Sequence, residues 1–162
     1  MNPDIKRIIV PIDFSAPSEA AARFACDLAR RLGAHLYLIH VIASPAVVPH
    51  GAGVSVAAPA WEVARAGLAT LRRHLGSAEI TTEVRTGSID EAITSAVTAY
   101  GVDLIVMATH GRSGVPHLLF GSVAEQVIRT ASCPVLVMRD SGKVRVHTPV
   151  RRDVEAGMAR TA

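Results

Sequence analysis

Lysine is nearly absent from this chain. Among its 162 residues, lysine and arginine together number 17, and only Lys6 and Lys143 are lysines. Aromatic residues make up 4% of the chain and charged residues 19%, which is below the roughly 25% of average soluble proteins. Because 49% of the residues are hydrophobic, the composition excludes a wholly disordered chain. It predicts one compact domain with a sizeable core.

Long apolar runs and cysteine clusters are also missing. The longest apolar candidate, residues 34–48, contains two histidines, a serine and a proline, and falls short of the roughly 18 residues of a membrane span. No secretory leader is visible, so we expect a cytoplasmic protein without membrane association. Cys26 and Cys133 stand in no redox or zinc spacing, and we expect two reduced, packed thiols.

The net charge of +3 is concentrated near the C-terminus. Residues up to Arg139 include 12 basic and 11 acidic side chains, whereas the segment from Asp140 onward includes five and three. That segment has acidic residues among its arginines and no aromatic residue for stacking on bases. The composition of this segment therefore argues against nucleic acid as a partner.

The period of the apolar residues alternates between strand and helix along the chain. Strand-like runs without polar interruption are typical of a parallel sheet covered on both faces. The sequence therefore predicts an α/β, doubly wound, open five-stranded parallel sheet with helices on both faces, a Rossmann-like fold. The expected strands are 5–12, 35–42, 79–85, 102–108 and 134–138, and the expected helices begin near Ser15, Trp61, Ser88 and Ser122.

Local signals mark the ends of these elements. Ser15 with Pro17 begins the first helix and Gly33 ends it, while Ser88-x-x-Glu91 and Ser122-x-x-Glu125 each fit a capping box. The polar strand 79–85 suits a sheet edge. Beyond Arg139 no period is sustained, so we expect a domain over residues 1–139 and a disordered tail over 140–162.

Chemistry in such a sheet is expected at the carboxyl ends of the strands, where the strand order reverses. The first strand ends in Asp13. The fourth continues into a glycine-rich segment, 111–122, that enters a helix. Backbone N–H groups at a helix N-terminus bind phosphate without needing lysine.

These motifs resemble the universal stress protein family. The resemblance rests on Ala108-Thr-His-Gly111, nine residues, then Gly121-Ser122, together with Val-Pro-Ile-Asp ending at Asp13, and it spans about residues 4–139. It implies a sheet of order 3-2-1-4-5, which places the reversal between the first and fourth strands. In the nucleotide-binding branch of the family the motif begins with glycine, where this chain has Ala108.

The resemblance implies a role for each motif residue. Asp13 would accept hydrogen bonds from ribose, the backbone of Ile12 and Val41 would hold adenine, and Arg112 would add charge. Phosphates would lie on Gly111, Gly121, Ser122 and Val123. The full implied nucleotide-binding set is Pro11, Ile12, Asp13, Val41, Met107, Ala108, Gly111, Arg112, Gly114, Gly121, Ser122 and Val123.

Each role has a purely structural alternative. Asp13 could cap the first helix, the Ser122 pair could only cap the last one, and the glycines could only permit a tight loop. A Cβ at position 108 would weaken binding if the site needs a positive φ or close approach of phosphate. His110 and His117 have no neighbouring acidic or thiolate ligand, so no metal site is expected.

Other phosphate and hydrolase chemistries lack their residues. The single Gly-Lys pair, Gly142-Lys143, precedes valine, so there is no P-loop. Asp13 has no acidic neighbour, which argues against a phospho-acceptor receiver. No Gly-x-Ser-x-Gly elbow occurs, and no glycine fingerprint follows the first strand, which argues against a serine hydrolase and NAD binding.

The sequence thus favours a stress-response module that binds ATP, ADP or AMP, with Mg or Mn entering on the phosphates. Two alternatives remain: slow ATP hydrolysis at the same site, or a dimeric interaction protein that no longer binds nucleotide. Homodimerisation through strand 134–138 is expected, because an apolar edge strand needs covering.

Overall fold

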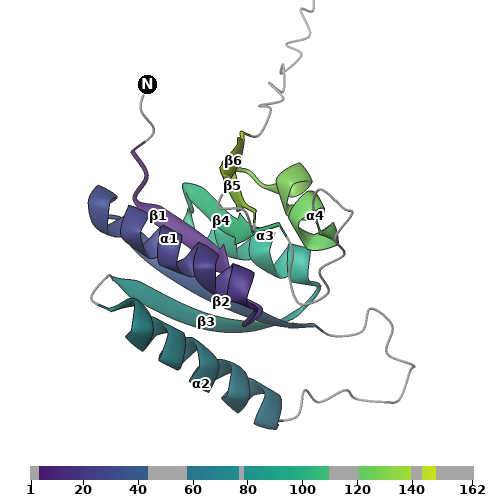
Figure 1. The fold of residues 1–162 in the computed structure, drawn as a ribbon. Coiled ribbons are helices and arrows are strands. Elements are labelled where there is room, and N and C mark those ends of the chain that lie inside the picture. The colour runs from purple at the N-terminus through teal and green to yellow at the C-terminus, as the bar shows by residue number, and fades with distance from the viewer. Residues whose placement is uncertain (1–3, 44–57, 77–78, 110–120, 140–143, 149–162) are drawn as a thin grey trace, which may run out of the picture.

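The computed structural model describes residues 4–43, 58–76, 79–109, 121–139 and 144–148. These residues form one six-stranded sheet of order β3-β2-β1-β4-β5-β6, flanked by four helices (Figure 1). The strands are β1 (Arg7–Pro11), β2 (His35–Ala43), β3 (Ile80–Gly87), β4 (Leu104–Ala108), β5 (Val135–Met138) and β6 (Val144–His147). The helices are α1 (Ala16–Leu32), α2 (Ala58–Leu75), α3 (Ile89–Tyr100) and α4 (Ser122–Thr130).

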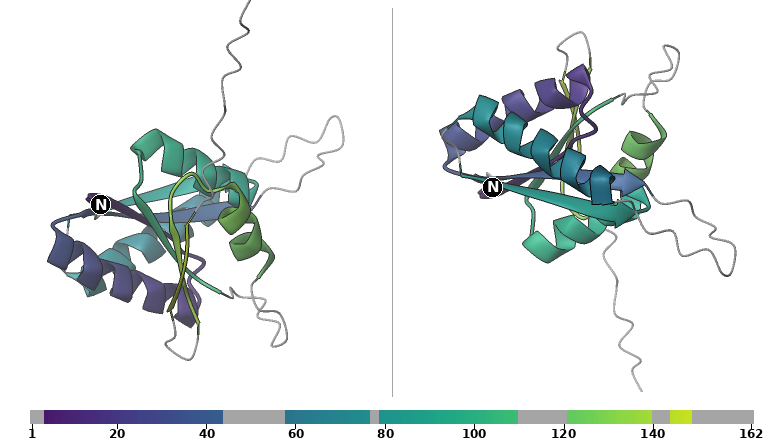
Figure 2. Two further views of the ribbon diagram at one scale, coloured as in Figure 1. Left: turned by 90° about the horizontal axis from the view of Figure 1, so that it is seen from above. Right: turned by 90° about the horizontal axis from the view of Figure 1, so that it is seen from below.

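The helices divide into two layers because side chains alternate across each strand. Ile8 and Val10 of β1 lie in the core beneath α1 and α2, whereas Ile9 lies in the core beneath α3 and α4. All three are fully buried. Figure 2 shows the sheet edge-on, with α1 and α2 on one side and α3 on the other. The doubly wound class and the order 3-2-1-4-5 of the five expected strands are confirmed.

The caps of α1 agree with the sequence signals, and the cap of α3 agrees only in its position. Ser15 is the N-cap of α1, where its side chain accepts from the Ser18 N–H, and Gly33 ends the helix at a φ of 63°. Ser88 is the N-cap of α3, but its hydroxyl donates to the Asp90 carboxylate and makes no capping bond. The prediction that Ser88 is the N-cap is therefore confirmed, whereas the predicted capping-box hydrogen bonds are wrong.

A sixth strand forms in the segment that the sequence analysis assigned to a disordered tail. Residues 144–147 pair antiparallel with β5, from Met138 opposite Val144 to Val135 opposite His147. The edge of β5 that was expected to need a second chain is thus covered by β6 of the same chain. The assignment of residues 144–147 to a disordered tail is wrong, because the strand depends on an edge that only the folded sheet provides.

We predict that β6 stabilises the sheet. Deleting residues 144–162 removes the ladder on β5 and should lower the free energy of unfolding by about 2 kcal/mol, at roughly 1 kcal/mol for each hydrogen bond lost. At this chain length the melting temperature should fall by about 4–8 °C. Deleting only residues 149–162 is the control and should leave the melting temperature nearly unchanged. Equal melting temperatures for the two deletions would show that β6 contributes nothing.

Candidate functional site

The strand order reverses between β1 and β4, and there the two strands separate. Their ladder ends at Ile9 opposite Ile105, whereas β1 stays paired with β2 as far as Pro11 opposite Ile39. The Asp103 N–H donates to the Arg7 carbonyl (2.9 Å), so the odd-numbered residues of β1 direct their peptide groups toward β4. Pro11 shares this direction and has no N–H to continue the ladder. Its position explains why the ladder between β1 and β4 stops here, at the place where the strand order predicts a ligand crevice.

Asp13 lies two residues beyond the end of β1, and its carboxylate is held by the start of α1. Oδ1 accepts hydrogen bonds from the Ser15 N–H (3.0 Å) and the Ser15 hydroxyl (2.5 Å). The Asp13 N–H donates to Oγ of the buried Ser18 (3.4 Å). Because Ser15 is the helix cap, the alternative that Asp13 caps α1 is wrong. The carboxylate is therefore held in one orientation at the carboxyl end of β1.

The backbone groups proposed for adenine differ in how they are used. The Ile12 N–H donates to the Ile39 carbonyl (2.8 Å), and the Ile12 carbonyl accepts from His40 Nδ1 (2.7 Å). Odd-numbered residues of β2 face β1, as the His35 N–H bond to the Lys6 carbonyl (2.8 Å) shows. Val41 therefore directs its peptide groups past the last rung of the β1 ladder. Its backbone is the better placed of the two for an adenine ring.

The end of β4 and the start of α4 are joined by backbone hydrogen bonds. The Gly121 N–H donates to the Thr109 carbonyl (2.7 Å), and the Thr109 N–H donates to the Met138 carbonyl (2.9 Å). Met107 is buried in the core, and Ala108 ends the strand. Gly121 is thereby held beside the carboxyl end of β4. Gly111, Arg112 and Gly114 lie outside the described residues.

Ala108 takes the place of the first glycine in the motif without backbone strain. Phe14 is the sole non-glycine residue of the described segments with a positive φ, so Ala108 has an ordinary strand conformation. The concern that this position needs glycine for a left-handed backbone does not apply.

The N-terminus of α4 differs from the expected capping box. Its N-cap is Gly121, and Ser122 is the first helical residue, with an exposed side chain. No described side chain caps the helix, and the Glu125 carboxylate instead pairs with Arg129 (3.2 Å). The capping-box alternative for Ser122 and Glu125 is therefore wrong. Val123 is half-buried against the core beneath α3 and α4. The first-turn N–H groups and the helix dipole suit an anion.

Phe14 and His40 also belong to this region, although sequence reasoning singled out neither for a role. Their rings are 4.6 Å apart between centroids, on the side of the sheet that α1 and α2 cover. The available signal was an aromatic residue directly after Asp13, in a strand-to-helix turn where glycine would be expected.

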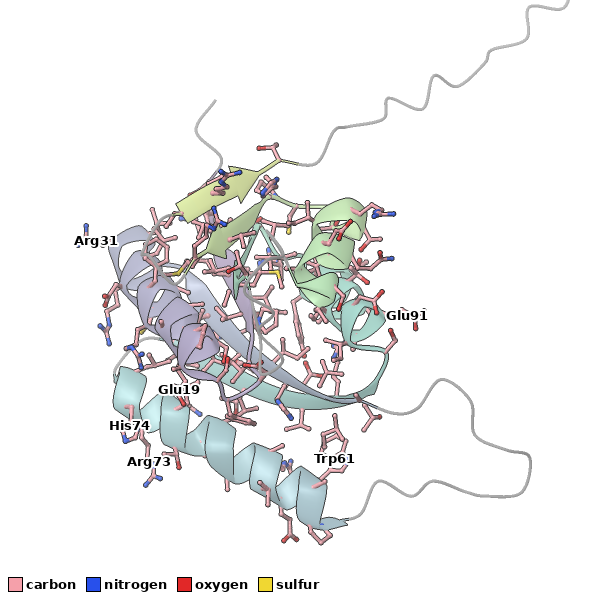
Figure 3. All side chains as sticks on the ribbon, turned by 45° about the vertical axis from the view of Figure 1, so that its right-hand side comes forward. Glu19, Arg31, Trp61, Arg73, His74 and Glu91 are labelled. Carbon is pink, nitrogen blue, oxygen red and sulfur yellow. The ribbon has the colours of Figure 1, made fainter. Side chains whose placement is uncertain are left out.

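A second concave region lies at the carboxyl end of the edge strand β3. It is a cleft of about 450 Å³ between the starts of α2 and α3, and Figure 3 shows Trp61 of α2 directed toward it. Its lining residues are Trp61, Arg85, Thr86, Gly87, Ser88, Glu91, Ala92 and Ser95. Two strands, β2 and β1, separate β3 from the β1–β4 crevice.

Arg85, one of the lining residues, is bound to groups of β3 and α3 around it. Arg85 donates to the Glu83 carboxylate (3.0 Å) and to the Ala92 carbonyl (3.2 Å), and the Tyr100 hydroxyl donates to the same carboxylate. Burial works to lower the pKa of Arg85, but its bonded Glu83 and the neighbouring Tyr100 outweigh this and raise it. The bond to Glu83 likewise raises the pKa of Tyr100. The Ser88 hydroxyl lowers the pKa of Asp90. This network fastens α3 to β3.

Two kinds of structural feature are absent from the described segments. They contain no group of three histidine, cysteine or carboxylate side chains arranged to hold a metal ion. They also contain no helix with the length and apolar character that crossing a bilayer requires.

Cys133 is buried, which raises the pKa of its thiol to about 11.

Comparison with known proteins gives a consistent result. Residues 4–139 match the universal stress protein family. A universal stress protein of Methanocaldococcus jannaschii is 35% identical over an alignment of 149 residues that covers 85% of this chain and 84% of that protein. Universal stress protein UspA from Lactobacillus plantarum superposes with a TM-score of 0.71 at 27% identity, covering 83% of this chain and 98% of that one.

Two further solved structures share the fold and carry nucleotides. One is a universal stress protein in complex with cAMP, with a TM-score of 0.62 at 21% identity, covering 83% of this chain and 97% of that one. The other is the universal stress protein from Archaeoglobus fulgidus in complex with dAMP, with a TM-score of 0.58 at 23% identity, covering 82% and 96%. The family match over residues 4–139 and the relative that is 35% identical show that this chain belongs to the universal stress protein family.

Proposed function

We propose that this protein binds an adenine nucleotide, ATP in the first instance, in the crevice between β1 and β4. The observation that carries the proposal is the N-terminus of α4, which no described side chain caps and which the bond from Gly121 to Thr109 holds at the end of β4. Related proteins with this fold are solved with cAMP and dAMP, which supports an adenine nucleotide as the ligand class.

The proposed site has three parts, one each for the phosphates, the ribose and the adenine. The N–H groups at Gly121, Ser122 and Val123 would receive phosphate, as helix N-termini commonly do. Asp13, oriented by Ser15, would accept from the ribose hydroxyls. The Val41 backbone would contact adenine. We propose that Gly111 and Arg112 complete the phosphate site and that Mg or Mn accompanies the phosphates.

We propose that the protein acts by binding and regulation, in the cytoplasm during stress. Phosphate would be held by backbone dipoles, and neither of the chain's two lysines lies in the motif. Dedicated phosphoryl-transfer enzymes position a lysine and a water-orienting side chain at the transferred phosphate. Binding that alters assembly or partner contacts is therefore the proposed activity.

We predict that ATP raises the melting temperature of the purified protein. At a hundredfold excess over the dissociation constant, the ligand adds about 2.7 kcal/mol to the free energy of unfolding. Gly121→Val should abolish the shift, because a branched side chain would occupy the space at the helix N-terminus. Ala99→Val, on the exposed face of α3, is the control and should keep it. The proposal fails if ATP, ADP and AMP all leave the melting temperature unchanged and mass spectrometry finds no bound nucleotide.

We also propose that the protein forms a homodimer. Since β6 occupies the edge of β5, the surface offered to a second copy is β6, the outermost strand on that side of the described sheet. Val144 and Val146 are 40% and 61% exposed there. An apolar edge strand is a template for pairing with another chain.

Light scattering should therefore give the mass of two chains. Val146→Lys should shift the mass toward one chain, because a charge on the edge opposes pairing, whereas Arg145→Lys should have little effect. A single-chain mass for the unaltered protein at high concentration would contradict the dimer.

A further inference from the structure

The residue after Asp13 has an unusual backbone. Phe14 has a φ of 62°, a left-handed conformation that bulky residues rarely adopt. Backbone strain of this kind persists only where surrounding contacts determine it. Phe14 joins the end of β1 to the cap of α1, so its conformation sets the path of the chain on both sides of the Asp13 carboxylate.

The Phe14 ring is held by a gap in α2. A Cβ at Gly67 would lie 2.7 Å from Cε1 of the ring and 2.9 Å from Cζ, closer than side chains approach one another. Glycine is otherwise unfavourable in the middle of a helix. Gly67 therefore serves as a notch that the Phe14 ring fills, and the ring also packs against the core beneath α1 and α2.

His40 also contacts the Phe14 ring. Its ring lies 4.6 Å from the Phe14 ring between centroids, and its Nδ1 donates to the Ile12 carbonyl (2.7 Å). The Ile12 N–H is bound to Ile39. The residue before Asp13 is thus fixed by β2, the residue after it by α2, and the carboxylate itself by Ser15.

We propose that the contacts among Phe14, His40 and Gly67, here called the lock, hold Asp13 in position. Because Gly67 belongs to α2, the packing of α2 then affects the position of the Asp13 carboxylate. The inference rests on the proposed function only where nucleotide affinity is concerned. These are positioning residues, since they act on a ligand through Asp13. A change in how α2 packs would reach the site through the Phe14 ring.

The lock is tested by two variants and their combination. Phe14→Gly removes the ring and permits the same φ without strain, and Gly67→Ala fills the notch. Val97→Ala, in α3 on the opposite face of the sheet, is the control for lost stability. In the full-length protein without nucleotide, NMR would record the 13C signal of the Asp13 carboxyl and the hydrogen exchange of the Ser15 amide. Calorimetry would then measure the dissociation constant for ATP.

In Phe14→Gly and in Gly67→Ala we expect the Asp13 signal to shift and the Ser15 amide to exchange about ten times faster through local opening. Nucleotide affinity should fall about tenfold, the effect of losing one charge-assisted hydrogen bond. Val97→Ala should lower the melting temperature without either NMR change. In the Phe14→Gly background, Gly67→Ala should raise the melting temperature, because alanine favours helix and the ring is gone.

Unchanged Asp13 and Ser15 signals in Phe14→Gly would overturn the lock. The same conclusion follows if Gly67→Ala raises the melting temperature equally with and without the ring. Changed signals with unchanged ATP affinity would support the lock and refute the role of Asp13 in nucleotide binding. Changed signals in a protein that binds no nucleotide would support the lock and refute the proposed function.

Discussion

The burial of β1 on both faces is the constraint on which the rest of this structure depends. Ile8, Ile9 and Val10 are fully buried and contribute alternately to the two cores. A strand with this pattern needs a neighbour on each edge and a helix layer on each face. Because β1 lies between β2 and β4, its carboxyl end is where the chain turns away to opposite faces of the sheet. The place of the candidate site follows from this.

The proposed site consists of main-chain groups and a few restrained side chains. Pro11 ends the hydrogen bonding toward β4, and the bond from Gly121 to Thr109 holds the start of α4 at the carboxyl end of β4. Asp13 is surrounded by fixed neighbours, so little reorganisation would be needed to receive a ligand. The scarcity of lysine fits this design, because dipoles of ordered peptide groups can replace a mobile cation in holding phosphate.

Much of this arrangement could be predicted from particular residues. The β-branched run before Asp13 and the caps Ser15 and Gly33 depend on local preferences, and the structure retains them. The two predicted capping boxes do not form. At Ser88 the hydroxyl donates to the nearby Asp90 carboxylate, and in α4 the N-cap is Gly121, one residue before the expected Ser122. A local motif shows which hydrogen bonds a side chain can make. Which bond forms depends on the other donors and acceptors within its reach.

The sequence by itself determined the alternation of strands and helices, the double-sided burial of the sheet and the family motif, since these depend on spacing and residue type. Tertiary structure alone decided three other features. Val144–His147 became a strand because the edge of β5 was available, since four residues have too little periodicity to predict one. Phe14 accepted a left-handed backbone because Gly67, 53 positions away in the printed sequence, left room for its ring. The Val41 backbone lies beyond the β1 ladder because β1 ends before it. Each depends on contacts between residues distant in the chain, and no local pattern contains them.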